Sequence, residues 1–369
     1  MASASRKAGL RADFPRHIEE ALEVLCRSLH DEAKLHWFGR MNTWLLAVTG
    51  LAGFLEVEKA FRDDPSLATT KLEPPVIVLG LPRSGTTFLH RLLGASEDAA
   101  SVALYQYFYP VPTGPVDLRR LNTTLTFEPW RLASGAYQMD AMHLIRSELP
   151  DECNWGMRVT GRSMIYWSAA PAYSYLRWLL GQDLRETYQF YRKMLLINQR
   201  SMPGKRLTLK CPYHGAWLPA LREALPEAHL VQTNRDPLET VPSDCKLTLS
   251  MQCMATPTLD LRQSVEHVVM KDQTFAERMV AFADTDEGKN VHHVDYRRLV
   301  KDPVGVAAEL HTTLGLPFST AHESALRGYA TENKQYKHGR NQYNLESFGL
   351  NPATIKQGFK AYRERFIES

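Results

Sequence analysis

The fold of this chain follows from the stretch VIVLGLPRSGTTFLHRLL, residues 76–93. Its first four residues are apolar and β-favouring, a pattern typical of a fully buried parallel strand, which we expect to end at Gly80. An amphipathic helix is expected to begin near Thr86. Backbone N–H groups at such a helix start can bind an anion, helped by the helix dipole. The stretch therefore predicts an α/β protein with an anion-binding loop after its first strand.

The turn at residues 80–87 differs from the phosphate loop of nucleoside triphosphatases. Its glycine spacing resembles G-x-x-x-x-G-K-[ST], but Thr86 stands where that motif has lysine. A triphosphate site uses that lysine on the β- and γ-phosphates, whereas the cation here, Arg83, lies earlier, within the turn. Ser84 and Thr87 add hydroxyl groups for an anionic oxygen. The turn therefore fits a phosphate that carries a sulfate better than a triphosphate, and a P-loop kinase or nucleotidase is the alternative.

Further strands are expected later in the chain, each followed by a helical pattern. The strand candidates are residues 206–210, 229–233 and 291–295, and the helices after them are residues 216–225, 238–250 and 304–314. Strands that alternate with helices imply a parallel sheet whose faces are covered by helices. The fold class is therefore α/β, with a P-loop-like parallel sheet.

The remaining regions are mostly helical in pattern. Apolar residues recur at helical spacing between residues 18 and 61, and the region between the first two strands is helical and rich in Tyr and Trp. No repeat, low-complexity tract or long linker marks a domain boundary. We therefore expect a single domain over residues 1–369, made of a helical preface (1–73), the strand-loop-helix (76–95), a large helical cap (104–205) and the rest of the sheet with the C-terminal tail (206–369).

A second phosphate signature follows the strand at residues 229–233. This strand leads into Arg235, and Ser243 lies eight residues later on the next helix. Arginine at the carboxyl end of a strand and serine on the following helix can converge on one phosphate at the ligand edge of an open sheet. A capped turn before a helix is the alternative interpretation of the arginine alone.

These motifs together resemble the sulfotransferase family. LPRSGTT, residues 81–87, is similar to its 5′-phosphosulfate-binding loop, and Arg235 with Ser243 resembles its pair for the donor's 3′-phosphate. LKCPYH, residues 209–214, is similar to its Lys-x-Pro-x-His stretch. The resemblance implies 3′-phosphoadenosine 5′-phosphosulfate (PAPS) as sulfuryl donor, 3′-phosphoadenosine 5′-phosphate (PAP) as product, and an acceptor with a hydroxyl group.

The resemblance extends to the C-terminal tail. Residues 343–350 and 359–366 are similar to the tail of bacterial members of the family. Cations just before them, Arg340 included, are expected to close over the nucleotide, and surface charge on a loop is the alternative. The residues implied to bind the donor are Arg83, Ser84, Gly85, Thr86, Thr87, Phe88, Arg235, Ser243 and Arg340.

Two cations are expected to take part in catalysis. Arg83 and Lys210 would hold the leaving phosphate and the developing negative charge while acceptor and leaving oxygens lie in line. The alternative for Lys210 is a solvated surface lysine. No metal is required for this chemistry, and no metal-ligand cluster is visible: His292 and His293 are adjacent in a predicted strand and should point to opposite faces.

The sequence offers two candidates for the general base. Gln106 stands in a stretch where relatives often carry glutamate, and glutamine cannot usefully accept a proton. We expect Glu152, with His143 second, to take this role from the helical cap. The alternative is that Asp151 and Glu152, after Pro150, cap a helix. His143 is equally open to a structural role.

Composition limits the remaining choices. A formal charge of +3 over 369 residues gives no global reason to expect nucleic acid or an anionic membrane surface as partner. The apolar stretch 43–55 is shorter than the roughly 20 residues of a spanning helix and is expected to be a buried helix. No secretion signal is visible, and five scattered cysteines favour reduced thiols. A cytoplasmic location is therefore expected.

The acceptor is the open question. The aromatic residues of the cap could line a pocket for a lipid, a phenol or a sugar, or they could pack in the core. These residues are Tyr105, Tyr107, Phe108, Tyr109, Trp130, Tyr137, Trp155, Tyr166 and Trp167. A nucleotide-binding protein that kept the fold without turnover is the non-enzymatic alternative.

Overall fold

The computed structural model describes residues 1–369 apart from residues 12, 115, 141, 333–343 and 369. Contacts between Cα atoms group the chain into two compact units. We call Glu73–Ser101, Met202–Lys246 and Val268–Ser369 the sheet unit. We call Met1–Leu72, Val102–Ser201 and Leu247–His267 the helical unit. The single domain expected from the sequence stays a prediction.

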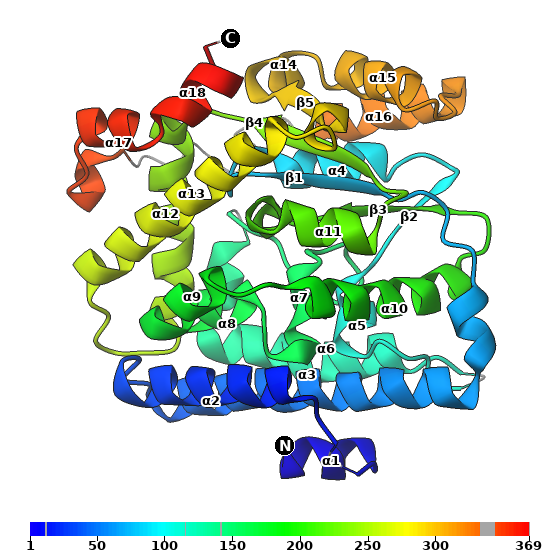
Figure 1. Cartoon of the computed structure of the whole chain (residues 1–369), viewed down its shortest axis with the longest axis vertical. Helices are drawn as coiled ribbons and strands as arrows, with labels where there is room; N and C mark the ends of the chain where they lie inside the picture. Colours follow the sequence, from blue (N-terminus) through cyan, green and yellow to red (C-terminus); the bar gives the residue numbers. More distant parts are fainter. Residues whose placement is uncertain (12, 115, 141, 333–343, 369) are drawn as a thin grey trace. The chain divides into compact units, whose positions relative to one another are not determined.

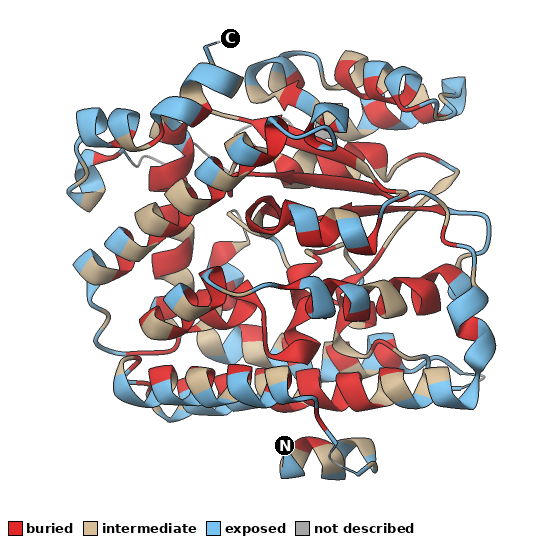
Figure 2. Cartoon of the chain, in the orientation of Figure 1, coloured by how far each residue is buried: buried red, intermediate tan, exposed pale blue. Residues whose placement is uncertain are grey.

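The described residues of the sheet unit form five parallel strands in the order β2-β3-β1-β4-β5 (Figure 1). The strands are β1 Val76–Gly80, β2 Ala99–Ser101, β3 Arg206–Lys210, β4 His229–Asn234 and β5 His292–Asp295. β1 lies in the middle of the sheet, and all five of its residues are buried (Figure 2). A strand paired on both edges and covered on both faces requires its apolar composition. The P-loop-like α/β fold expected from the sequence is confirmed.

Helices cover the sheet. Their bounds are α4 Thr86–Leu93, α11 Leu218–Ala224, α14 Tyr296–Lys301, α15 Pro303–Thr313, α16 Thr320–Glu332, α17 Pro352–Gly358 and α18 Lys360–Phe366. Val76 and Val78, which alternate along β1, join α4, α14, α15 and α16 in one hydrophobic cluster. α12, Pro237–Cys253, and α13, Leu261–Ala283, contribute residues to both units.

The helical unit contains no strand of the sheet among its described residues. Its helices are α1 Ala2–Ala8, α2 Arg16–Asp31, α3 Trp37–Asp63, α5 Leu104–Phe108, α6 Arg119–Ser134, α7 Asn154–Met157, α8 Met164–Ala169, α9 Tyr173–Leu180 and α10 Arg185–Ser201. The stretch 43–55 lies within α3, where Leu46, Leu51 and Phe54 are buried, so the expected buried helix is confirmed. Across the described part of the chain, no helix combines the length and apolarity needed to cross a membrane.

β2 and α14 are among the elements that were not expected from the sequence. β2 has the small residues AAS, and its pairing with β3 rather than its own propensity makes it a strand. α14 follows β5 directly, with the Asp295 carboxylate accepting the Arg297 N–H at its N-cap. The three later strands and the helices after them lie close to where the sequence placed them.

Gly80 ends β1 at a point of close backbone approach. Its φ angle is 144°, which favours glycine. A Cβ atom at this position would lie 2.4 Å from the carbonyl oxygen of Thr233, its partner on β4. The turn from the central strand into the loop therefore depends on a missing side chain.

We predict that Gly80→Ala lowers the free energy of unfolding by about 3 kcal/mol, because it combines a strained φ angle with a backbone collision. Gly204→Ala is the matched control, since Gly204 has a φ angle of 72° and no atom within 4 Å of an added Cβ. That variant should lose about 1 kcal/mol. Urea unfolding of both variants measures the difference, and equal losses would contradict the role given to the Thr233 contact.

Candidate functional site

The loop after β1 has the geometry of an anion-binding turn. Arg83 and Gly85 have positive φ angles of 67° and 93°, and Gly85 is the N-cap residue of α4. A Cβ atom at Gly85 would lie 2.8 Å from the ring of Tyr296, so glycine is required there. The first N–H groups of a helix have no acceptor within the helix, and together with the helix dipole they favour an anionic oxygen.

Three residues of the two phosphate signatures belong to one hydrogen-bonded set. The Nε of Arg83 donates to the Oγ of Ser243 at 3.0 Å. The Nη1 of Arg235 donates to the backbone carbonyl oxygen of Arg83, also at 3.0 Å. The loop after β1, the turn after β4 and the helix α12 are therefore linked through Arg83. The sequence placed Arg235 and Ser243 together, and the structure joins both to the first loop.

Arg235 is oriented by two further contacts. Its guanidinium carbon lies 4.0 Å from the centroid of the Tyr296 ring, and its Nη2 donates to Oε2 of Glu239 at 2.7 Å. The side chain of Glu239 is 58% exposed, so this pair contributes at most about 1 kcal/mol. The adjoining pocket, which Arg235 and Tyr296 line, also has the carboxylates of Asp236, Glu239 and Asp295 in its wall, so an anion there would have to displace Glu239 from Arg235.

Lys210 is buried at the end of β3, with 1% of its surface exposed. Its Cα atom lies opposite Val78 of β1. β1, β3 and β4 run parallel, so their last residues, Gly80, Lys210 and Asn234, lie at the same edge of the sheet, where ligands of open α/β sheets bind. The alternative of a solvated surface lysine is wrong.

The side chains of the other loop residues differ in how far they are buried. Ser84 is buried, and its hydroxyl contacts the Leu81 carbonyl oxygen at 2.6 Å and the Thr233 hydroxyl at 2.7 Å, so its hydrogen bonds hold the loop to β4. Thr86 is also buried, whereas Thr87 and Phe88 are partly exposed. The Phe88 ring stacks on Tyr329 at 6.0 Å. Direct donor binding by these side chains stays a prediction.

A buried ion cluster that the sequence did not indicate lies next to Ser243. The ammonium group of Lys271 donates to Asp244 at 2.9 Å and to Asp272, and none of the three side chains is more than 2% exposed. Burial raises the pKa of Asp272 to about 7, with Lys271 opposing and Asp244 adding to the shift. Its Oδ2 has no hydrogen-bond partner among the described residues. A protonated Asp272 would leave the cluster with one positive and one negative charge.

The candidate bases lie in the helical unit. The Nε2 of His143 is 3.9 Å from Oδ1 of Asp151, and the same oxygen accepts the N–H of Glu152 at 2.7 Å. Glu152 is partly exposed. α7 begins at Asn154 with Cys153 as its N-cap, so Asp151 and Glu152 lie just before this helix and not in its first turn.

Gln106 has a structural role that explains why an amide stands there. Its Oε1 accepts the N–H of Ala103 at 2.8 Å at the start of α5, and its Nε2 donates to Oδ1 of Asn198 at 2.9 Å. A carboxylate could accept the first bond but could not donate the second. The side chain is buried and cannot serve as a base.

The remaining expectations concern Arg340 and the presence of a metal site. Arg340 lies outside the described residues. Among the residues that the structure does describe, no group of three or more His, Cys, Asp or Glu side chains is arranged to hold a metal ion.

Comparisons with known proteins agree with this geometry. The profile of the Sulfotransferase family matches residues 74–320. Sulfotransferase STF1 from Mycobacterium tuberculosis H37Rv is similar with 28% identity and a TM-score of 0.79, over 97% of this chain and 96% of that one. Sulfotransferase STF9 from Mycobacterium avium has 24% identity and a TM-score of 0.84, over 99% and 95%, and shows the same fold. No curated protein sequence matches the chain significantly.

The buried cluster generates a prediction about pH. Because the folded pKa of Asp272 is raised above the unfolded value of about 4, the folded state binds more protons between about pH 4 and pH 7. The free energy of unfolding should therefore fall as pH rises through this window, by up to about 1.4 kcal/mol per pH unit from this group.

We predict that Asp272→Asn removes this part of the pH dependence, because asparagine cannot ionise. Urea unfolding between pH 4.5 and pH 7.5 measures it, and the exposed Asp286→Asn is the control. If the wild-type protein and Asp272→Asn show the same slope, Asp272 ionises normally in the folded state.

Proposed function

Because the chain belongs to the sulfotransferase family, we propose that it transfers a sulfuryl group from PAPS to the hydroxyl group of an acceptor. The observation that carries the proposal is the link from Arg83 to Ser243 and Arg235. It joins the loop suited to a 5′-phosphosulfate with the arginine and serine suited to a 3′-phosphate. A nucleotide that carries both groups matches this pair of anion sites, whereas a triphosphate needs the lysine that Thr86 replaces.

The residues of the sheet unit fit the donor. The N–H groups at the start of α4 and the cationic side chain of Arg83 suit the 5′ end of the nucleotide. Arg235 is held by the Tyr296 ring, and its guanidinium group suits a phosphate. Lys210, buried at the edge where β1 and β3 end, adds a positive charge in a region of low dielectric.

The proposed chemistry follows from these charges. The acceptor oxygen attacks sulfur, the bond from sulfur to the 5′-phosphate oxygen breaks, and the electron pair leaves with PAP. The leaving oxygen gains negative charge, which Arg83, Lys210 and the α4 N–H groups would stabilise. The acceptor's proton passes to a base, for which we propose Glu152 first and His143 second. Transfer of labelled sulfate from PAPS to a panel of alcohols, read by mass spectrometry, tests the function, and binding of PAP without transfer to any alcohol would favour the non-catalytic alternative.

Nucleotide selectivity is the first prediction of this proposal. PAP should stabilise the folded protein against heat more than AMP does, because only PAP offers a 3′-phosphate to Arg235 and Ser243. Arg235→Ala should weaken PAP binding by about 10-fold or more and bring PAP and AMP close together. Arg298→Ala, an exposed arginine of the same unit paired with Glu309, is the control. Unchanged selectivity in Arg235→Ala would remove this residue from the donor site.

The base is tested with matched amides. Glu152→Gln keeps the size and hydrogen-bonding capacity of the side chain but removes its basicity, so it should slow transfer by about 100-fold or more while PAP binding stays intact. Glu148→Gln, an exposed glutamate of the same segment, is the control and should transfer normally. Normal turnover in Glu152→Gln together with loss in His143→Gln would give the role to the histidine.

A further inference from the structure

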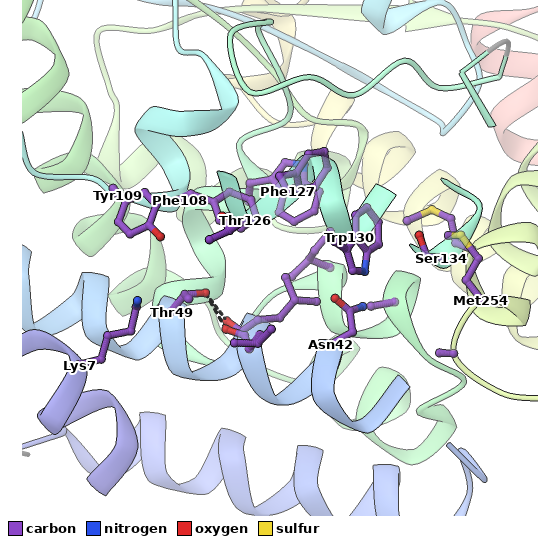
Figure 3. Close-up of a pocket in the computed structure, with 17 residues that line it drawn as sticks. Lys7, Asn42, Thr49, Phe108, Tyr109, Thr126, Phe127, Trp130, Ser134 and Met254 are labelled. Atoms are coloured by element: carbon purple, nitrogen blue, oxygen red, sulfur yellow. Dashed lines mark hydrogen bonds between the residues drawn. The ribbon is translucent and has the colours of Figure 1, made fainter. Parts of the chain in front are cut away.

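The helical unit contains a pocket that the proposed chemistry does not use. Its empty volume, which includes space open to solvent, is about 960 Å³. The walls include residues of α3, α5, α6, α7, α8 and α12, and Lys7 of α1 lies at one end (Figure 3). All of the lining residues belong to the helical unit.

Most of the wall is apolar. The apolar side chains are Leu45, Leu46, Phe108, Phe127, Trp130, Trp155, Ile165, Ala169, Met251, Met254 and Ala255. The described residues that line the pocket include no carboxylate. Two of the hydroxyl groups in the wall are already engaged, since Thr49 donates to the Leu45 carbonyl at 2.7 Å and Thr126 to the Asn122 carbonyl at 2.9 Å. A sugar would find few partners here, whereas a hydrocarbon chain would be well accommodated.

One end of the pocket is cationic. Lys7 lies there with Tyr109 and Thr49, whereas Ser134 and Met254 lie toward the other end (Figure 3). The ammonium group of Lys7 is 5.8 Å from the Tyr109 ring centroid. Burial raises the pKa of the nearby Glu56 carboxyl, whereas Lys7 and Arg158 lower it. Among the described residues that line the pocket, Lys7 is the one charged side chain, so the charge at this end complements an anionic group.

Trp130 presents a hydrogen-bond donor at the pocket wall. Its indole N–H is buried at the pocket wall and finds no acceptor among the described residues. A buried donor without a partner usually points to a bound water or ligand.

We propose that this pocket binds a long-chain carboxylate, with its hydrocarbon chain along the aromatic and aliphatic wall and its carboxylate beside Lys7. The proposal concerns the helical unit alone and does not depend on which group the sheet unit transfers. It assigns to the chain a site for an apolar, anionic ligand in addition to its nucleotide site.

Tryptophan fluorescence of the full chain tests the site directly. Bromine on a bound chain quenches indole fluorescence on contact, and two of the seven tryptophans, Trp130 and Trp155, line the pocket. Added 12-bromododecanoate should quench the fluorescence saturably, at concentrations well below those at which it forms micelles. Unbrominated dodecanoate should reverse the effect, and Trp130→Phe should reduce it strongly.

Two variants test separately how the pocket wall and the positive charge of Lys7 contribute to binding. Thr49→Phe fills the pocket from α3 and should weaken binding by about 10-fold or more. Thr312→Phe is its control, because Thr312 is exposed on a helix with its hydroxyl likewise bonded to the carbonyl four residues earlier. Lys7→Gln should weaken dodecanoate binding by about 5-fold and leave binding of 1-dodecanol unchanged.

Each result bears on the proposal in a definite way. Quenching that does not saturate, or that persists at full affinity in Thr49→Phe, would overturn the assignment of the pocket. Equal affinity for dodecanoate and 1-dodecanol in the wild-type protein would overturn the assignment of an anionic ligand. Circular dichroism melts show that each variant is folded, so that loss of binding is not loss of structure.

Discussion

The structure of the sheet unit depends on how closely the backbone of β1 can approach β4 before it turns. The turn from β1 into α4 needs positive φ angles at Gly80, Arg83 and Gly85. A side chain at Gly80 would meet β4, and one at Gly85 would meet Tyr296. This steric constraint sets the position of the α4 N-terminus, and with it the direction in which the helix N–H groups point.

The position of Ser243, in the second phosphate signature, is supported by a buried ion cluster next to it. Ser243 lies on α12 immediately before Asp244, which is bound to Lys271 of α13 in a fully buried cluster. A buried ion pair is weak evidence for added stability, but breaking it is costly, so it fixes the relative register of the two helices. Arg83 then connects this helix to the loop after β1. Positions far apart in the sequence thus act on one small region of the sheet edge.

Local sequence was sufficient for some of these features and insufficient for others. The buried strand, the loop and the Arg235–Ser243 pair follow from short patterns, because local residue types determine each of them. The cluster of Asp244, Lys271 and Asp272 gives no such pattern, since its members meet only after two helices pack. β2 has no strand propensity of its own. The hydrogen bonds that make Gln106 a structural residue come from Asn198, which no local pattern links to it.

The interleaving of the two units along the chain affects how the protein is made. β1, the central strand, is synthesised before its partners β3 and β4, and the segment Val102–Ser201 of the helical unit comes between them. The nascent chain therefore emerges with an apolar strand that has neither neighbour. Non-local pairing of this kind slows folding and leaves unpaired strand edges exposed to aggregation. The topology that places β1 at the centre of the sheet therefore also delays the burial of this strand until β3 and β4 have been synthesised.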